Sequence, residues 1–213
     1  MTHGSQKLHR LIAVFIMLLV ASEMIAYIAT VPRPSEQFFQ LYLLGATHTA
    51  SDFYPNQDTN IRPGEPITWY VGATDNMGNT EFVSIIVKVS NATIKAPDDL
   101  EALPSPAPAI AEFARFLQDN ETWEIPFTWS IPNASLYQGS VHILMLQINN
   151  QTYQIPDWSA SNGYNFRIIL ELWTWQTDIS AFEYGWIVSG EHRTAWLQLW
   201  FNMTNPVPPP PSA

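Results

Sequence analysis

Several stretches of the sequence alternate between apolar and polar residues with a period of two, which is the spacing at which side chains of a β-strand point to opposite faces of a sheet. In EFVSIIVKVS, residues 81–90, one face carries Val83, Ile85, Val87 and Val89. The other face carries Ser84, Lys88 and Ser90. This pattern predicts a strand with one buried face and one face exposed to solvent.

The same alternation predicts strands in PITWYVGAT, TWEIPFTWS and TAWLQLWFNMT. Pro126 in the second of these lacks a backbone N–H, so this strand belongs at a sheet edge or a bulge. Further strands are expected at 38–44, 138–148 and 164–175, with turns rich in Gly, Pro, Asn and Asp between them. Roughly seven or eight short strands of this kind indicate an antiparallel β-sandwich.

Two segments depart from the strand pattern. Residues 96–118 begin Pro-rich and acidic, and then place Ile110, Phe113, Ala114 and Leu117 at helical spacing. We therefore expect an insertion that contains one amphipathic helix packed on a sheet edge. The C-terminal residues 205–213, NPVPPPPSA, predict a disordered polyproline II tail.

Residues 11–31 form a long apolar run near the N-terminus. As a helix this run would extend about 30 Å, which matches the hydrocarbon core of a bilayer. Lys7 and Arg10 precede it, and this asymmetry favours a cytoplasmic segment at 1–10 with the rest of the chain outside the cell. The run therefore predicts a single transmembrane helix that anchors an extracytoplasmic domain at 36–204.

Glu23 interrupts this run and leaves two interpretations open. The apolar residues contribute on the order of −3 to −7 kcal/mol to insertion, while one central acid costs about 2.5 to 3.5 kcal/mol, so insertion tolerates the glutamate. Glu23 is then a candidate intramembrane contact with a partner helix, or an acid that is protonated or reaches the interface. Alternatively the run is a signal peptide cleaved after Ser22, because Val20-Ala21-Ser22 has the small residues that signal peptidase recognises.

Composition narrows the class of protein. Nearly half of the 213 residues are hydrophobic and nine are Trp, which is enough for a sizeable core. From residue 32 onward seven Lys and Arg stand against eighteen Asp and Glu, a formal charge of −11, which disfavours binding to nucleic acid. The absence of cysteine excludes disulfides, thiolate zinc sites and iron–sulfur clusters. An exported domain without disulfides favours a prokaryotic source.

Five N-x-S/T sequons lie beyond the apolar run, at Asn91, Asn120, Asn133, Asn150 and Asn202. Such sequons are acceptors for N-linked glycans on exported proteins. They agree with the location outside the cell, and they are the glycosylation candidates of a predicted glycoprotein.

The residues also support a family resemblance. The stretch from FFQLYLLG through PGEPITWYVGATDNMGN to FVSIIVKVSN, together with NETWEIPFTW and the closing LELWTW and LQLWFNMT, resembles an archaeal family of membrane-anchored proteins that carry a domain of unknown function. The resemblance covers residues 36–204. It implies an Ig-like sandwich on the outside of an archaeal cell membrane, and it supplies no catalytic residues.

Motifs for catalysis are absent from the sequence. There is no G-x-S-x-G, no phosphate-binding loop and no H-E-x-x-H. DFYPNQDTN and DNMGN gather oxygen ligands, but neither has the spacing of a calcium loop, and Asp and Asn are common in turns. We expect no enzyme activity, no cofactor and no metal site.

The aromatic surplus suggests an interface. If Leu197, Leu199 and Phe201 face the core, Trp196 and Trp200 share the opposite face of their strand, and Trp173 and Trp175 form a similar pair. Exposed aromatic side chains of this kind can anchor a protein interface or stack on sugar rings. The alternative is that the insertion or a second sheet covers them.

The sequence thus predicts a mainly β protein, an Ig-like antiparallel sandwich with one inserted helix behind a single transmembrane helix. We interpret it as a non-enzymatic binding or scaffolding domain of the cell envelope, with the membrane and another envelope or membrane protein as partners. The alternatives are an accessory subunit of a membrane complex and a carbohydrate-binding module. The oligomeric state is not predicted.

Overall fold

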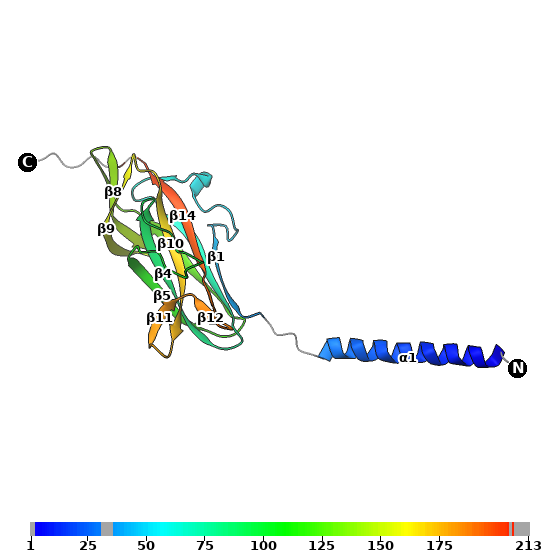
Figure 1. Ribbon diagram of the computed structural model, residues 1–213. Coiled ribbons are helices and arrows are strands. Elements are labelled where there is room, and N and C mark those ends of the chain that lie inside the picture. The colour runs from blue at the N-terminus through cyan, green and yellow to red at the C-terminus, as the bar shows by residue number, and fades with distance from the viewer. Residues whose placement is uncertain (1–2, 31–35, 205, 207–213) are drawn as a thin grey trace, which may run out of the picture. The chain divides into compact units, whose positions relative to one another are not determined.

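The computed structural model describes residues 3–30, 36–204 and 206, and divides the chain into two units. The first contains one helix, α1 (His3–Thr30). The second begins at Gln37 and consists of strands and their connections (Figure 1). Within the described part of the chain, no helix combines the length and the apolar character that a membrane crossing needs.

The second unit contains two six-stranded sheets, called sheet I and sheet II, and a small hairpin. Sheet I consists of β1 (Phe38–Leu44), β3 (Ile67–Asn76), β6 (Thr122–Ser130), β7 (Ala134–Tyr137), β8 (Ser140–Ile148) and β9 (Gln151–Ser161). Sheet II consists of β2 (Asn60–Ile61), β14 (Trp196–Met203), β10 (Phe166–Gln176), β4 (Glu81–Asn91), β5 (Ala109–Leu117) and β11 (Ala181–Tyr184). The hairpin pairs β12 (Trp186–Val188) with β13 (Glu191–Arg193), and a 3₁₀ turn spans Pro55–Gln57.

The strand order gives each sheet two edges. Ile148 of β8 pairs with both β6 and β9, and Ile143 of β8 pairs with both β7 and β9. β6 and β7 therefore lie on the same side of β8, and sheet I runs from β1 to β9. Sheet II runs from β2 and β14 to β5. All ladders are antiparallel except the short parallel pairing of β2 with β14.

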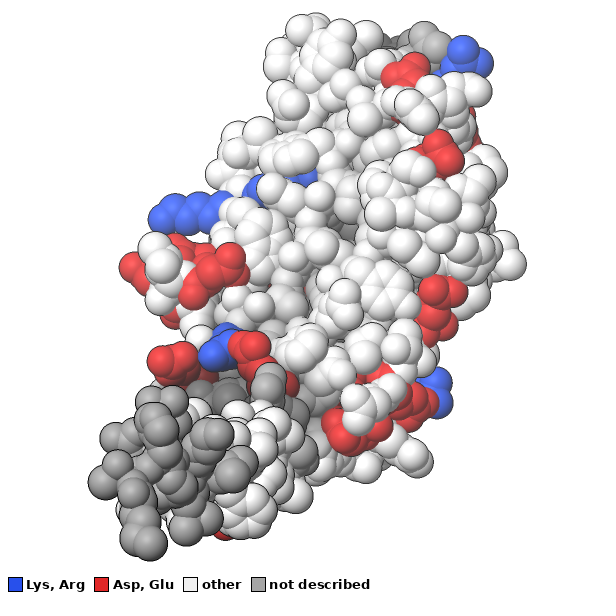
Figure 2. All heavy atoms as spheres, turned by 90° about the vertical axis from the view of Figure 1, so that its right-hand side faces the viewer, with Lys and Arg blue, Asp and Glu red and all other residues white. Residues whose placement is uncertain are grey.

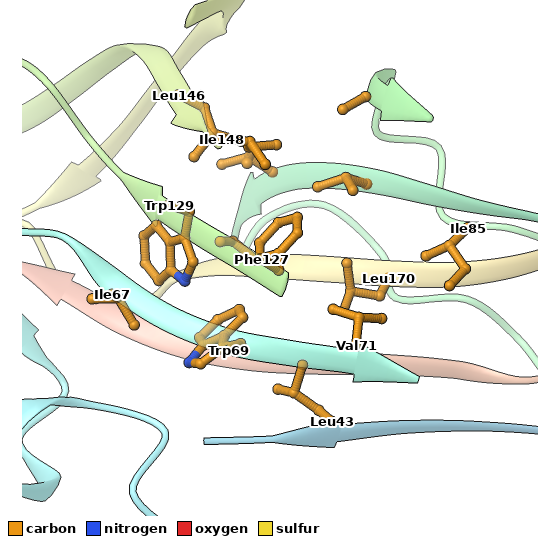
Figure 3. Packing of buried hydrophobic residues seen from close by; sticks show 14 of the residues in the cluster. Leu43, Ile67, Trp69, Val71, Ile85, Phe127, Trp129, Leu146, Ile148 and Leu170 are labelled. Carbon is orange, nitrogen blue, oxygen red and sulfur yellow. The ribbon is translucent and has the colours of Figure 1, made fainter. Parts of the chain in front are cut away.

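One hydrophobic core lies between the sheets. Trp69, Phe127 and Trp129 come from sheet I, and Ile85 and Leu170 come from sheet II (Figure 3). The Trp69 ring lies 5.0 Å from that of Trp129 and 6.0 Å from that of Phe127, so aromatic rings fill much of the space between the layers.

The alternating apolar faces of β3, β4 and β6 point into this core, which confirms the strands that the sequence predicts there. Pro126 lies where β6 pairs with β3 alone, because β8 pairs with β6 only at Trp129 and Ser130. On the free side of β6 the Asn149 side chain donates to the carbonyl of Pro126 and accepts from the N–H of Thr128. Pro126 is thus at an edge position, as expected.

The predicted amphipathic helix within 96–118 is wrong. Residues 109–117 form strand β5, which pairs with β4 from Glu81 opposite Leu117 to Val87 opposite Ala111. Ala111 and Leu117, which share one face of the strand, are buried, while Phe116 lies on the opposite face. The residues at helical spacing include positions from both faces of this strand, and pairing with the apolar edge of β4 decides the conformation.

The prediction of a half-exposed β4 is also wrong. Ser84, Lys88 and Ser90, the polar residues of its outward face, are buried like the apolar residues of the inward face. A further layer of chain must therefore cover this face of sheet II. The predicted tail at 205–213 lies, apart from Pro206, outside the described residues.

Candidate functional site

The candidate interface residues all lie on the face of sheet II that points away from the core. These residues are Trp173 and Trp175 of β10 and Trp196 and Trp200 of β14. In the β10–β14 ladder, Trp196 lies opposite Glu171 and Trp200 lies opposite Arg167. The structure thus brings the predicted same-face pairs together, with charged residues of β10 between them.

Residues 92–108, which we call the covering segment, cross this face. The N–H of Ser105 donates to Glu171 Oε1 over 2.8 Å, and the carbonyl of Ser105 accepts from Lys88 Nζ over 2.7 Å. Trp196 Nε1 donates to Asp99 Oδ1 over 2.7 Å. These contacts explain why the polar face of β4 is buried, and why Trp196 is only partly exposed.

A buried ion pair lies beneath the covering segment. Lys88 Nζ and Glu171 Oε2 are 2.8 Å apart, and the two side chains are 5% and 0% exposed. Trp173 Nε1 donates to Glu171 Oε2 over 3.0 Å, and Lys88 Nζ lies 5.7 Å from the centroid of the Trp173 ring. Removing two charges from water costs several kcal/mol each, and this arrangement offsets the cost by giving each charge more than one polar partner.

Arg167 makes a second polar cluster on the same face. Its guanidinium donates to Ser90 Oγ over 3.0 Å, to Gln198 Oε1 over 2.7 Å and to the carbonyl of Ile94. Burial lowers the pKa of Arg167 from its usual value. The ring of Trp200 covers the guanidinium at 4.8 Å. Trp200, at 37% exposed, is the most accessible of the four tryptophans.

Trp175 belongs to an aromatic cluster at the other end of β10. Phe82 lies at its centre, 4.3 Å from the ring of Phe116, 5.0 Å from that of Phe182 and 6.0 Å from that of Trp175. Phe116 is 65% exposed. The four tryptophans therefore have different surroundings: Trp173 lies on the Lys88–Glu171 pair, Trp196 bonds to Asp99 of the covering segment, Trp200 lies over Arg167, and Trp175 packs in this cluster.

The outward face of sheet I is open by comparison. Tyr42 of β1 lies across Gly72 of β3, where any Cβ would be 1.9 Å from the Tyr42 ring. Burial and the neighbouring Glu124 carboxylate both raise the pKa of Tyr42. His48 stacks on Tyr70 at 3.5 Å and places Nδ1 3.3 Å from Glu124 Oε1. This side-chain group fixes the start of the β1–β3 connection to the sheet.

The β1–β3 connection also borders a shallow groove of about 640 Å³, whose lining includes Asp52, Phe53, Asn56 and Gln57. The loop is held from both sides, because Trp69 Nε1 donates to the carbonyl of Phe53 over 2.5 Å and Tyr54 donates to the carbonyl of Trp200 over 2.8 Å. Amides, a carboxylate and a phenyl ring offer hydrogen bonds and one apolar contact to a ligand. Sequence reasoning assigned this stretch to turns and missed the groove.

The five sequons fall into two groups. Asn120, Asn133 and Asn150 are exposed in connections between strands. Asn91 is 8% exposed and donates to the carbonyl of Ser159 over 2.7 Å. Asn202 donates to Asn60 Oδ1 over 3.0 Å and accepts from the N–H of Asn165. The amide nitrogen of Asn120 donates to Asp119 Oδ2 over 2.7 Å at the surface, whereas the side chains of Asn91 and Asn202 are engaged with other strands and loops of the fold.

Glu23 lies exposed on α1, among exposed apolar side chains from Ile12 to Ile28. Ser22 Oγ donates to the carbonyl of Leu19 over 2.8 Å, a contact within the helix. The candidate role of Glu23 as an intramembrane contact rests on the sequence.

The acidic side chains of DFYPNQDTN and DNMGN, the two stretches that gather oxygen ligands, form hydrogen bonds within their own turns. Asp58 accepts from the N–H of Asn60, and Asp52 accepts from Thr47 and Gln57. Asp75 Oδ1 accepts from the N–H of Met77 over 2.7 Å, while Oδ2 is buried without a hydrogen-bond partner. Among the residues that the structure describes, no three His, Asp or Glu side chains lie close enough to hold a metal ion.

Comparison with known proteins adds little to this geometry. No protein-family model and no curated protein matches the sequence. Among solved structures, the chain is similar to a β-glucosidase from Listeria innocua in complex with gluconolactone, at 11% identity and a TM-score of 0.30. The match covers 78% of this chain but only 16% of that enzyme chain. Similarity at this level identifies neither a fold nor an activity.

Proposed function

We propose that this protein is a membrane-anchored, non-enzymatic binding or scaffolding component of the cell envelope, in which a single N-terminal helix displays an Ig-like β-sandwich outside the cytoplasmic membrane. The observation that carries the proposal is the division of the chain into one unit with a helix that exposes apolar side chains and a β unit with its own core. A helix of this kind needs an apolar environment, whereas the β unit does not.

The argument for the anchor rests on the length of the apolar run and on the basic residues that precede it. Side chains 12–28 of α1 are exposed and mostly apolar, and the sequence extends the same apolar run to Leu11 and Val31. A helix of about 20 apolar residues spans a hydrocarbon core. Lys7 and Arg10 lie close before the run and only Arg33 lies close after it, and this excess of basic residues favours a cytoplasmic N-terminus.

The argument for binding rather than catalysis comes from the surfaces of the β unit. Its most conspicuous polar residues, Lys88, Glu171 and Arg167, are occupied in holding the covering segment. The accessible features are the groove of the β1–β3 connection, Trp200 and the cluster around Phe116. Aromatic side chains and amides at such positions suit recognition of a partner surface.

The absence of cysteine allows a direct test in intact cells. We expect a maleimide that does not cross membranes to label a single cysteine at Ser51, an exposed position of the β1–β3 connection. The matched variant Ser5→Cys should be labelled only after lysis. Labelling of Ser5→Cys in intact cells with protection of Ser51→Cys would reverse the orientation and refute the proposal.

The same variants distinguish an anchor from a cleaved signal peptide. Retention of α1 predicts that the protein remains in the membrane fraction after alkaline extraction and has the mass of the full chain. Cleavage after Ser22 would instead release the β unit into the soluble fraction, with Glu23 as its first residue. That outcome would remove the anchor from the proposal while leaving the external location.

A further inference from the structure

Edge strands expose unpaired backbone groups, and folded proteins usually protect them with charges, prolines or bulges. On one side of the β unit the edges are β9 and β5. β9 contains Pro156 and Asp157, and its pairing with β8 is interrupted by a register shift. β5 contains Glu112 and Arg115, and its pairing with β4 is also interrupted. Both edges carry the usual protection.

The edge formed by β1 lacks every one of these features. Its sequence, FFQLYLL, contains no charged residue, no proline and no glycine. All seven residues pair with β3 in unbroken register, from Phe38 opposite Asn76 to Leu44 opposite Tyr70. An uninterrupted, uncharged edge of this length is the kind of strand to which another strand can add.

The hydrogen bonds of β3 identify the free backbone groups of β1. The N–H of Asp75 donates to the carbonyl of Glu121, and the carbonyl of Asp75 accepts from the N–H of Asn120, so the backbone of Asp75 points away from β1. In an antiparallel ladder the direction alternates along the strand. Phe39, opposite Asp75, therefore directs its N–H and C=O away from β3, and Leu41 and Leu43 do the same.

These groups are available, and apolar surface lies beside them. Within the described residues, nothing hydrogen-bonds to the outward backbone groups of Phe39, Leu41 and Leu43. β1 contacts β14 of the other sheet, and the core side chains along this open side, Leu41, Leu197 and Leu199, are only partly buried. A strand added to β1 would satisfy the backbone groups and cover part of this surface.

The charge distribution on this side favours a second copy of the chain. On the face shown in Figure 2 the acidic side chains form separate groups, and the surface between them is largely uncharged. Although the β unit is strongly acidic, two copies that meet along β1 bring no charged strand residues together. β1 of a second copy is itself an uncharged, extended segment of the same length, so it can pair with β1 along the whole strand.

We propose that β1 is a self-association edge, at which two copies of this chain pair β1 with β1 in an antiparallel arrangement and extend sheet I across a twofold axis. Residues that lie opposite each other in such a pair must share a face of the sheet. Centred on Leu41, the pairing places Gln40 of one copy opposite Tyr42 of the other. The proposal goes beyond the proposed function and does not depend on the anchor.

The expected affinity is low. A single added strand of seven residues buries less than the roughly 1,200 Å² of a standard stable interface, so we expect dissociation constants in the micromolar range or weaker. Association would be strongest where copies are concentrated on a surface, because confinement raises the effective concentration. This is the behaviour that a scaffold assembled laterally would show.

A cysteine scan in the purified full chain tests the pairing, since the native sequence contributes no thiol. Single cysteines at Gln40, Leu41 and Tyr42, which are exposed or partly exposed, should give disulfide-linked homodimers under mild oxidation, with a maximum at the residue on the twofold axis. The control is Ala114→Cys, an exposed position on β5. Equal dimer yields at all positions, or yields no greater than that of Ala114→Cys, would overturn the proposal.

A charge variant separates edge pairing from association through α1. Gln40→Lys places a charge at an exposed position of β1 and should weaken the dimer at least tenfold by sedimentation equilibrium, without changing the circular dichroism spectrum. Ala114→Lys on β5 is the matched control and should leave association unchanged. A dimer whose dissociation constant is unchanged by Gln40→Lys would show that β1 does not pair with itself.

Discussion

Two regions of the β unit bury carboxylates in different ways. Beneath the covering segment, Glu171 contacts the ammonium of Lys88, the N–H of Ser105 and the indole N–H of Trp173. At the end of β3, Asp75 is also 0% exposed, but only one of its oxygens has a hydrogen-bond partner. Hydrogen bonds and an ion pair therefore replace the lost hydration of the Glu171 carboxylate, whereas the hydration of the Asp75 carboxylate is replaced only in part.

The comparison shows that burial alone does not determine the cost of a charge. A carboxylate with an adjacent cation and two N–H donors keeps much of the stabilisation that water gave it. Asp75 instead has acidic neighbours, and burial together with Glu81 and Asp119 raises its pKa to about 6 despite the bond from Met77. Buried Glu171 should therefore destabilise the fold when Lys88 is removed. Asp75 should destabilise the fold when its carboxyl group loses its proton.

Removal of the Lys88 ammonium should have the largest effect. Lys88→Met leaves Glu171 buried without its cation, which costs about 3 to 5 kcal/mol of unfolding free energy. Urea denaturation of the full chain measures this loss. The double variant Lys88→Met with Glu171→Leu should recover most of it, because no unpaired charge then remains.

An exposed ion pair provides the control for this prediction. Arg115 and Glu121 are 2.7 Å apart but largely accessible, so Arg115→Met should cost less than about 1 kcal/mol. If Lys88→Met costs no more than Arg115→Met, the buried pair is not what holds the covering segment to sheet II.

Asp75 should make stability depend on pH in the opposite sense to a paired carboxylate. Its pKa is about 6 in the folded protein and near 3.8 in the unfolded chain, so the folded state binds the proton more tightly. The contribution of Asp75 to stability is then fully present below about pH 4 and is lost as the pH rises through 6. A difference of about two pKa units corresponds to about 2 to 3 kcal/mol.

Asp75→Asn tests this by removing the titration while keeping an acceptor for Met77. The variant should be more stable than the native protein at pH 7.5, and the difference should shrink toward pH 4.5. A native protein whose Asp75-dependent stability rises between these pH values would contradict the assignment, since that slope belongs to a carboxylate with a lowered pKa.

The sequence predicts the elements of these regions better than their surroundings. Alternation places Val83, Ile85 and Val87 on one face of β4, and the structure agrees because a strand has only two faces. What covers the other face is a property of residues 92–108, whose sequence shows only that they are irregular and Pro-rich. The apolar residues that share this outward face, Ile86 of β4 and Ile169 of β10, are the local sign in the sequence that the face is covered.

The candidate site was predictable to a similar degree. The alternation in β14 predicts that Trp196 and Trp200 share one face. It does not predict that their environments differ, which arises because Asp99 bonds to Trp196 while Trp200 lies over Arg167. The groove and the Tyr42–Gly72 contact were not predictable, since each joins residues that only the strand order brings together. β5 was misread because helical and alternating spacings overlap over nine residues.

The smallest effect is expected at the rim of the covered face. Trp200→Ala removes the ring that lies over Arg167 at 4.8 Å, and a partly exposed cation–π contact contributes about 0.5 to 1 kcal/mol. Trp200→Phe keeps an aromatic face and should retain part of that stability in the same urea titration. Arg167 keeps its bonds to Ser90 and Gln198 in both variants, so its charge stays compensated. If Trp200→Ala cost more than Lys88→Met, packing by tryptophan and not the paired charges would be what stabilises this face.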